Sequence, residues 1–134
     1  MLRLPRLAPL ALSVLAAGFG PAAADPLLGL WQTEPDQKGQ VGIVQVRPCG
    51  PALCGRVVRV IAPGGADVVT RSMGRDLFWG LVPLGEGRYG RGRVWVPLYD
   101  KVVDARARLA GDSLTVQGCL GPVCDGQTWR RRRR

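Results

Sequence analysis

Short runs of valine, leucine, isoleucine, tryptophan and threonine recur about every ten residues from residue 28 onward, and glycine and proline separate them. Within the later runs apolar and polar residues alternate, so that Leu114 and Val116 fall on one face and Thr115 on the other. A period of two is typical of antiparallel strands with one buried face. The pattern predicts strands over residues 28–34, 40–48, 53–62, 77–84, 89–97, 101–109, 112–118 and 125–131.

The predicted strands and the chain length together indicate a single all-β domain. A chain of 134 residues has room for one domain and little more. Eight short strands joined by tight turns favour a small antiparallel up-and-down β-barrel, because closing the sheet removes the exposed edges of an open one. An open sandwich is the alternative. The longest irregular stretch, residues 63–76, is expected to cap one end and has room for a helical turn.

The first 24 residues have the three parts of a secretory signal peptide. Two arginines make the start basic, residues 7–19 are mainly apolar, and residues 22–24 are a small-residue cleavage site. Glycine and proline break the apolar run, which is too short for a helix that spans a membrane. We therefore expect a periplasmic or secreted protein of residues 25–134.

Four cysteines occur in two copies of one spacing. Cys49 and Cys54 enclose a Gly-Pro pair, and the arrangement recurs at Cys119 and Cys124. Of the three pairings that four cysteines allow, we favour the two local disulfides, because each would close a tight loop between strands. A zinc site is the less favoured alternative in an exported protein, and redox dithiols usually have two residues between their cysteines. The prediction is two structural disulfides and no bound metal.

No catalytic residue or cofactor is predicted. The chain contains no histidine, which excludes Ser-His-Asp and Cys-His catalysis and histidine-ligated zinc. Residues 85–90 spell Gly-x-Gly-x-x-Gly, but a strand follows them instead of the helix that a dinucleotide site needs. Outside the predicted leader, neither Ser72 nor Ser113 lies in a Gly-x-Ser-x-Gly elbow.

Arginine dominates the charge, and much of it lies at the C-terminus. Removing residues 1–24 takes away two arginines and lowers the net charge from +9 to +7, of which Arg130–Arg134 supply five. Consecutive like charges favour extended, solvated chain that attracts polyanions. Arg131, Arg132, Arg133 and Arg134 are candidate contacts for anionic envelope lipid; the favoured alternative is an incidental run beyond the last strand. Export disfavours nucleic acid as the polyanion.

A second group of arginines lies mid-chain and bears on the barrel interior. If some of them pointed inward, they would hold a carboxylate or phosphate group of a small ligand. Arg93, Arg106 and Arg108 instead alternate with apolar residues, which predicts that most of the arginines lie outside the barrel. A small apolar or anionic ligand in the interior and a filled interior remain alternatives. These arginines are Arg71, Arg75, Arg88, Arg91 and Arg93.

Several short motifs in a fixed order resemble the domain-of-unknown-function 2147 family of small exported bacterial proteins. They are Gly29-Leu30-Trp31, Cys49-Gly50, residues 53–58, Gly92-Arg93-Val94 with Pro97, residues 114–119, and Gln127-Thr128-Trp129-Arg130. The resemblance implies an exported, lipocalin-like barrel and no reaction. Two loops depart from the family pattern, at residues 67–69 and 99–103, which leaves the ligand of this member open.

The resemblance also implies structural roles for four residues. In lipocalin-like barrels a first-strand tryptophan lies across the closed end, and an arginine of the last strand packs on its ring. Trp31 and Arg130 are the matching residues here, as a cation–π pair. Gly29 belongs to the same first-strand motif as Trp31, and Trp129 belongs to the same last-strand motif as Arg130.

Together these features predict an exported, non-enzymatic binding or envelope-associated protein. One alternative is a structural or stress-related surface protein with a filled barrel and no ligand. An enzyme of unrecognised type is less favoured.

Overall fold

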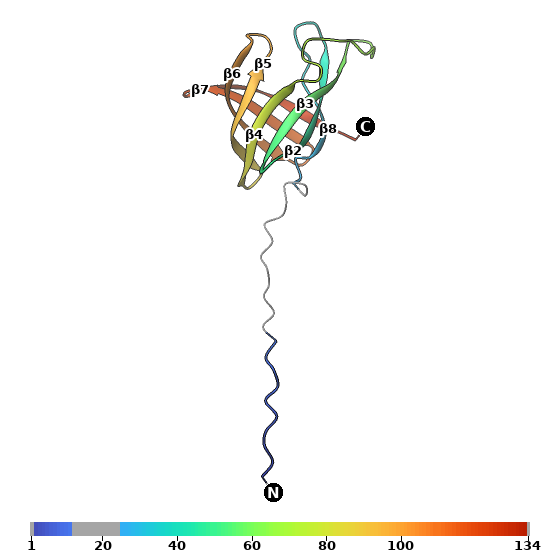
Figure 1. The fold of residues 1–134 in the computed structure, drawn as a ribbon. Coiled ribbons are helices and arrows are strands. Elements are labelled where there is room, and N and C mark those ends of the chain that lie inside the picture. The colour runs from blue at the N-terminus through green and yellow to red at the C-terminus, as the bar shows by residue number, and fades with distance from the viewer. Residues whose placement is uncertain (1, 12–24, 134) are drawn as a thin grey trace.

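The computed structural model describes residues 2–11 and 25–133. Within them eight antiparallel strands, each paired with the next and the last with the first, form a closed barrel (Figure 1). No helix occurs in these residues. The strands are β1 (Gly29–Gln32), β2 (Val41–Cys49), β3 (Ala52–Ile61), β4 (Asp76–Gly85), β5 (Arg88–Val96), β6 (Lys101–Ala110), β7 (Ser113–Leu120) and β8 (Val123–Arg132). The predicted up-and-down barrel is confirmed.

All eight strands begin and end within two residues of the predicted ranges. The irregular stretch 63–76 forms hydrogen-bonded turns, and not the helical turn for which it had room. The Val68 amide donates to the Val60 carbonyl at 2.9 Å, and the Gly74 amide to the Val57 carbonyl at 2.8 Å. These bonds attach the loop to β3.

The predicted leader falls largely outside the described residues. Residues 12–24, which hold most of its apolar run and the expected cleavage site, are not among them. Residues 2–11 form neither helix nor strand. Nowhere in the described chain is there a helix of the length and apolarity needed to cross a membrane.

Successive turns alternate between the two ends of the barrel. The β2–β3, β4–β5 and β6–β7 turns lie at one end, which we call the plug end. The β1–β2, β3–β4, β5–β6 and β7–β8 connections lie at the other, the loop end. In Figure 1 the N-terminal chain joins the barrel at the plug end.

Residues 25–28 close the plug end. Leu27 is fully buried, and its carbonyl accepts a hydrogen bond from Trp31 Nε1 at 2.9 Å. The Asp25 carboxylate accepts from the Leu27 amide at 2.8 Å and from the Tyr89 hydroxyl at 2.6 Å. Burial, reinforced by the hydrogen bond and charge of Asp25, raises the pKa of Tyr89 far above its ordinary value. The plug is thereby attached to β1 and to β5.

Apolar side chains fill the interior. The rings of Phe78 and Trp129 lie with centroids 6.2 Å apart, and both are buried. Gly55 faces Phe78, and a side chain at that position would overlap the ring. The buried apolar side chains form one contiguous cluster, which supports the filled interior of the two that the sequence leaves open.

The barrel closes through a short ladder between β1 and β8. Its three residue pairs are Leu30–Arg132, Trp31–Arg131 and Gln32–Arg130. The prediction of a solvated tail over residues 130–134 is therefore wrong for Arg130, Arg131 and Arg132, because pairing with β1 outweighs the repulsion between neighbouring arginines. Arg133 lies past the strand, and Arg134 is outside the described residues.

β8 extends well beyond its short partner. Among the described residues, 123–129 pair with β7 but with no strand on the opposite side. There the Thr128 amide donates to the carboxylate of Glu34 at 3.1 Å. The first part of β8 is thus an edge strand, whereas its partner β7 also pairs with β6 on the other side.

Both predicted disulfides are present. Cys49–Cys54 joins β2 to β3 at the plug end, and Cys119–Cys124 joins β7 to β8 at the loop end. Each cross-link holds the tip of one hairpin.

Candidate functional site: an arginine-lined hollow

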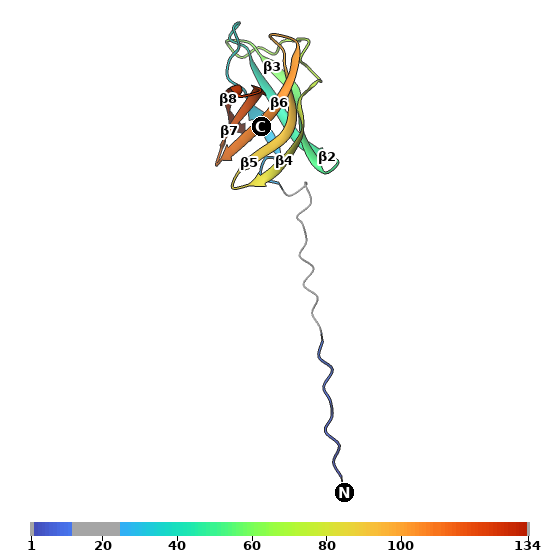
Figure 2. The ribbon, with the colours of Figure 1, turned by 90° about the vertical axis from the view of Figure 1, so that its left-hand side faces the viewer.

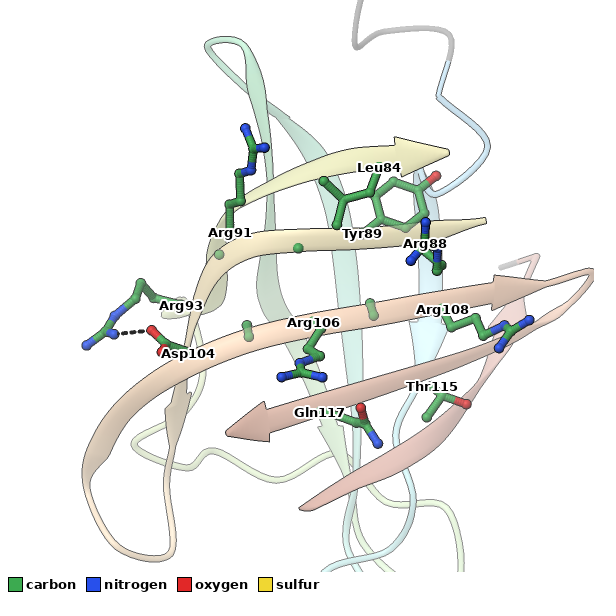
Figure 3. Close-up of a pocket in the computed structure, with 14 residues that line it drawn as sticks. Leu84, Arg88, Tyr89, Arg91, Arg93, Asp104, Arg106, Arg108, Thr115 and Gln117 are labelled. Atoms are coloured by element: carbon green, nitrogen blue, oxygen red, sulfur yellow. Dashed lines mark hydrogen bonds and ion pairs between the residues drawn. The ribbon is translucent and has the colours of Figure 1, made fainter. Parts of the chain in front are cut away.

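A solvent-open hollow of about 800 Å³ lies on the outer face of β5, β6 and β7 (Figure 3). Leu84 at the end of β4 forms part of its border. The polar side chains around it are Arg88, Arg91, Arg93, Asp104, Arg106, Arg108, Thr115 and Gln117. We call it the arginine hollow.

The alternation of β6 brings its arginines to this face. Ala105 and Ala107 are buried in the interior, so Arg106 and Arg108 must point outward. The same alternation turns Arg93 of β5 outward. The prediction that most mid-chain arginines lie outside the barrel agrees with these positions.

A β-bulge in β5 opens space beside Arg106. Tyr89 pairs with Ala107 and Gly92 with Ala105, so two residues of β5 lie opposite one residue of β6. The bulge residue Arg91 has a φ of 61°, in the left-handed region that non-glycine residues rarely adopt. The other bulge residue, at position 90, is a glycine and fills none of the hollow. The Leu84 side chain lies over this glycine, since a Cβ at position 90 would meet Leu84 Cδ1 at 2.8 Å.

The charges around the hollow are strongly unequal, with five arginines and one carboxylate. That carboxylate, Asp104, is paired with Arg93. Arg88 lies directly across from Arg108 in the ladder between β5 and β6, and like charges in this arrangement are destabilising. Among the described residues no carboxylate pairs with either of these two, or with Arg106. The site is thus poised to receive an anion.

Neutral hydrogen-bonding side chains complete the hollow on β7. Thr115 pairs with Arg108 and Gln117 with Arg106 in the β6–β7 ladder. Figure 3 shows the Arg106 side chain extending toward Gln117, whereas Arg91 points away from both. Arg106, Arg108 and Arg88 therefore form the core of the site, with Arg91 at its border.

At the plug end, Trp31 packs with an arginine one position later than predicted. The Arg131 guanidinium lies 4.4 Å from the centroid of the Trp31 ring and donates to the carbonyls of Leu28 at 3.2 Å and Pro26 at 2.7 Å. The assignment of Arg130 is wrong. The physical reason is strand parity: Arg131 shares the inward face of β8 with Trp129, so Arg130 points outward.

Comparisons with known proteins place this fold in a family. A model of the family described as "uncharacterized protein conserved in bacteria (DUF2147)" matches residues 29–131. The chain belongs to this family. Among solved structures it is similar to protein HP1028 from the human pathogen Helicobacter pylori, a member of the lipocalin family, with 16% identity and a TM-score of 0.61. The similarity covers 79% of this chain and 82% of that one, and it shows a lipocalin-like fold. A search of the curated proteins found no match.

In this family member the remaining mid-chain arginines support the loops. Arg75 stacks on the buried ring of Trp95 at 3.6 Å, and Arg71 donates to the Pro97 carbonyl at 2.6 Å. Both arginines therefore fix the β3–β4 loop to the end of β5. Of the five arginines singled out in the sequence, the other three border the hollow.

Sequence reasoning placed Arg106 and Arg108 on the outer face but did not connect them with a site. Their Arg-x-Arg spacing on a strand was the available signal, since it brings two guanidiniums to the same face. The bulge that brings Arg88 and Arg91 to the same region has no comparable signal.

The arginines predicted to contact anions near the C-terminus have other partners. Arg131 also forms an ion pair with Asp112 at 3.2 Å, and Arg132 donates to the Gln32 amide oxygen at 3.2 Å. Arg133 is exposed, with Asp112 at 3.8 Å. Gly29, the first residue of β1, adopts a φ of 120° beside Arg131. This region closes the barrel.

Proposed function

We propose that this protein is an exported, non-enzymatic binding protein, and that its ligand is a compact polyanion held in the arginine hollow. The observation that carries the proposal is the pair of like charges, Arg88 and Arg108, facing each other across β5 and β6 with no carboxylate between them. An anion between the two guanidiniums would convert a repulsive contact into two attractive ones.

The chemistry of the hollow favours phosphate or carboxylate groups. Guanidinium groups bind these anions through two parallel hydrogen bonds, which gives direction as well as charge. Thr115 and Gln117 add neutral donors and acceptors on one side. A ligand with several closely spaced anionic groups would engage Arg88, Arg106 and Arg108 together.

The filled interior supports a second candidate. Because Phe78 and Trp129 occupy space that a lipocalin-like barrel would need for a ligand, the barrel itself is a candidate structural surface protein that binds nothing. The two candidates differ in what the outer face does, and one binding experiment separates them.

The experiment is isothermal titration calorimetry of residues 25–134, which contain the whole barrel, with inorganic tripolyphosphate at low and moderate salt. We expect binding that weakens as salt rises. Replacing both Arg106 and Arg108 by glutamine should weaken binding at least about tenfold, since charge-assisted hydrogen bonds are lost. The matched control replaces Arg56 and Arg59, which lie outside the hollow on β3 and are paired with Asp76 and Asp67.

The control removes the same charge and should change affinity less than about threefold, because only the long-range field is altered. Equal losses in the two variants would mean that net charge alone attracts the anion and would overturn the site. No binding by the unaltered protein would favour the structural candidate.

A further inference from the structure

Unpaired arginines of the outer face continue beyond the arginine hollow to β8. Arg130 is exposed and points outward, and no carboxylate of the described residues forms an ion pair with it. Its neighbour across the β7–β8 ladder is Ser113. The hollow reaches Thr115, which lies two residues from Ser113 on the same face of β7. A fourth guanidinium without an acidic partner therefore lies next to the hollow.

Strand register places these side chains in one row across the sheet. Arg88 of β5 lies opposite Arg108 of β6, and Arg108 lies opposite Thr115 of β7. Thr115 lies opposite Thr128 of β8, two residues before Arg130. Figure 2 shows the four strands side by side, coloured from yellow to red.

The row is longer than the hollow itself. With strands about 4.8 Å apart and residues about 3.4 Å apart along a strand, Arg88 and Arg130 are separated by roughly 16 Å along the sheet. We call the four arginines and the neutral side chains between and beside them the basic band. Its residues are Arg88, Arg106, Arg108, Ser113, Thr115, Gln117, Thr128 and Arg130.

Two carboxylates near the basic band are neutralised by other arginines. Asp104 is paired with Arg93. Asp112, in the β6–β7 turn, lies 3.2 Å from Arg131 and 3.8 Å from Arg133. Neither carboxylate leaves a net negative charge beside the band.

Two further carboxylates lie at the borders of the basic band. Glu86 is in the β4–β5 turn, before Arg88. Glu34 lies beyond the edge of β8, where it accepts a hydrogen bond from the Thr128 amide at 3.1 Å. The four arginines of the band outnumber these two acidic groups, so the band keeps a net positive charge.

The length of the basic band favours an extended ligand. A compact anion between Arg88 and Arg108 uses one end of the band only. A chain with acidic groups along its length would also reach Arg130. Contacts made by one continuous chain reinforce each other, because the second contact forms at a high effective concentration.

Neutral hydrogen-bonding side chains separate the charges of the basic band. Ser113 and Thr115 lie on β7 between Arg108 and Arg130, and Gln117 lies on the same face. Hydroxyl and amide side chains both donate and accept hydrogen bonds, whereas a guanidinium only donates. A ligand with hydroxyl groups next to its acidic groups would use both kinds of side chain. Sugars that carry a carboxylate have this composition.

The side chains of the basic band, all within the described residues, include no aromatic ring. Tyr89 borders the hollow but is only 4% exposed. Proteins that bind single-stranded nucleic acid stack the bases on exposed aromatic side chains. The band therefore favours a saccharide over a nucleic acid.

We propose that the basic band binds a linear polysaccharide whose sugars carry carboxylates. The carboxylates contact the four arginines, and the sugar hydroxyls contact the neutral side chains between them. The inference rests on the proposed function, since the arginine hollow is one end of the band. It deepens that function by naming the class of ligand.

The test is isothermal titration calorimetry of residues 25–134 with galacturonate oligomers of two and eight sugars. The octamer should bind at least about tenfold more tightly than the dimer. Arg130→Gln should weaken octamer binding at least about fivefold, because a charge-assisted hydrogen bond is lost. The same variant should bind tripolyphosphate within about twofold of the unaltered protein, because its hollow is intact.

The matched control is Arg59→Gln on β3, which removes one charge outside the basic band. It should change the affinity for either ligand by less than about twofold, because only the long-range field is altered. Circular dichroism verifies the fold of both variants. We expect the Arg130 variant to fold, since its pairing with Gln32 uses the backbone and its exposed side chain has no acidic partner.

Single-stranded oligothymidylate of the same charge tests the class of ligand. The galacturonate octamer should bind at least about threefold more tightly, because its hydroxyls bond to the neutral side chains. Replacing Ser113 by alanine and Thr115 by valine should remove this preference. Equal affinities of the unaltered protein for the two polymers would make the band a non-selective polyanion surface and would overturn the inference.

Tripolyphosphate separates this inference from the proposed function. Tripolyphosphate binding without octamer binding, or equal losses of octamer affinity in the Arg130 and Arg59 variants, would overturn the inference and leave the proposed function standing. Failure of the protein to bind either ligand would overturn both.

Discussion

Asp76 shows at the scale of one residue how three strands of the wall are joined. Its carboxylate, at the start of β4, lies 3.0 Å from Arg47 of β2 and 3.3 Å from Arg56 of β3. Partial burial acts to raise the pKa of Asp76, but the hydrogen bonds and positive charges of the two arginines outweigh it. The pKa is therefore lowered from its ordinary value of 3.8.

This lowered pKa predicts the pH dependence of an Asp76→Asn variant. A carboxyl group whose pKa is lower in the folded state stabilises the fold above its unfolded pKa, and the contribution disappears as pH falls through the folded pKa. At pH 7 the variant should lose about 1 kcal/mol of unfolding free energy, a small value because the ion pairs are partly solvated. The difference should shrink below about pH 4 and vanish at lower pH.

Urea unfolding at several pH values measures the difference. Glu86→Gln is the control, since Glu86 has no ion-pair partner among the described residues and should show no such trend. A difference that stays constant down to pH 2 would contradict the ion-pair explanation.

Arg130 and Arg131, near the end of β8, show where sequence reasoning fails at the scale of single residues. Alternation was plain on β6 and β7, where small or apolar side chains mark the inner face. From residue 130 to residue 134 every residue is arginine, so the sequence does not indicate which of these side chains point into the barrel. Pairing with β1 and the inward position of Trp129 decide that Arg131, and not Arg130, contacts Trp31.

At the scale of elements, the strands were predictable because glycine and proline mark nearly every turn. β1 is shorter than predicted, because its pairing with β8 ends at Gln32. On the other side, the Thr33 amide still donates a hydrogen bond to the Gly42 carbonyl. The bulge at Arg91 was not predictable, because a register shift depends on how two strands meet. The arginine hollow needs that bulge, so its location could not be derived from the sequence.

The unpaired edge of β8 leads to a prediction about the Cys119–Cys124 disulfide. Residues 123–129 of β8 have a neighbour strand on one side only, so the Cys119–Cys124 bond joins this edge segment to β7, which the rest of the sheet holds through β6. Replacing both cysteines by serine should cost about 2 kcal/mol at most by loop entropy. We expect much of the effect to be local opening of this hairpin.

Amide hydrogen exchange of the intact protein and the variant checks this. Protection should fall in residues 123–129 of β8 and stay unchanged in β2 and β3. The comparison is the Cys49 and Cys54 double serine variant, whose hairpin includes Leu53, a residue paired with neighbours on both sides. A loss of protection spread evenly over the barrel in the Cys119 variant would contradict the local explanation.

At the scale of the whole molecule, the barrel is a rigid support for its outer surface. Buried apolar side chains pack the interior, the plug closes one end, and the arginine hollow lies on the outer face. Ligand binding on such a fold depends on outward-facing side chains. The sequence indicates how many of them there are, but it does not indicate the distances between them. The lipocalin-like architecture therefore followed from pattern and resemblance, whereas the candidate site required the coordinates.

Closure of this support depends on the last residues of the chain. Removing Arg131–Arg134 deletes two of the three β1–β8 pairs and every contact of Arg131 with Trp31 and the plug. We expect the melting temperature to fall by about 10 °C or more, which corresponds to a loss of a few kcal/mol in a domain of this size. Removing only residues 133–134 should change it by less than about 2 °C, because surface substitutions cost little and Arg133 is exposed. Thermal unfolding followed by circular dichroism compares the two truncations with the full barrel. If both melted alike, the short ladder between β1 and β8 would not be what holds the barrel closed, and the plug and the filled interior would have to close it without help from the terminal arginines.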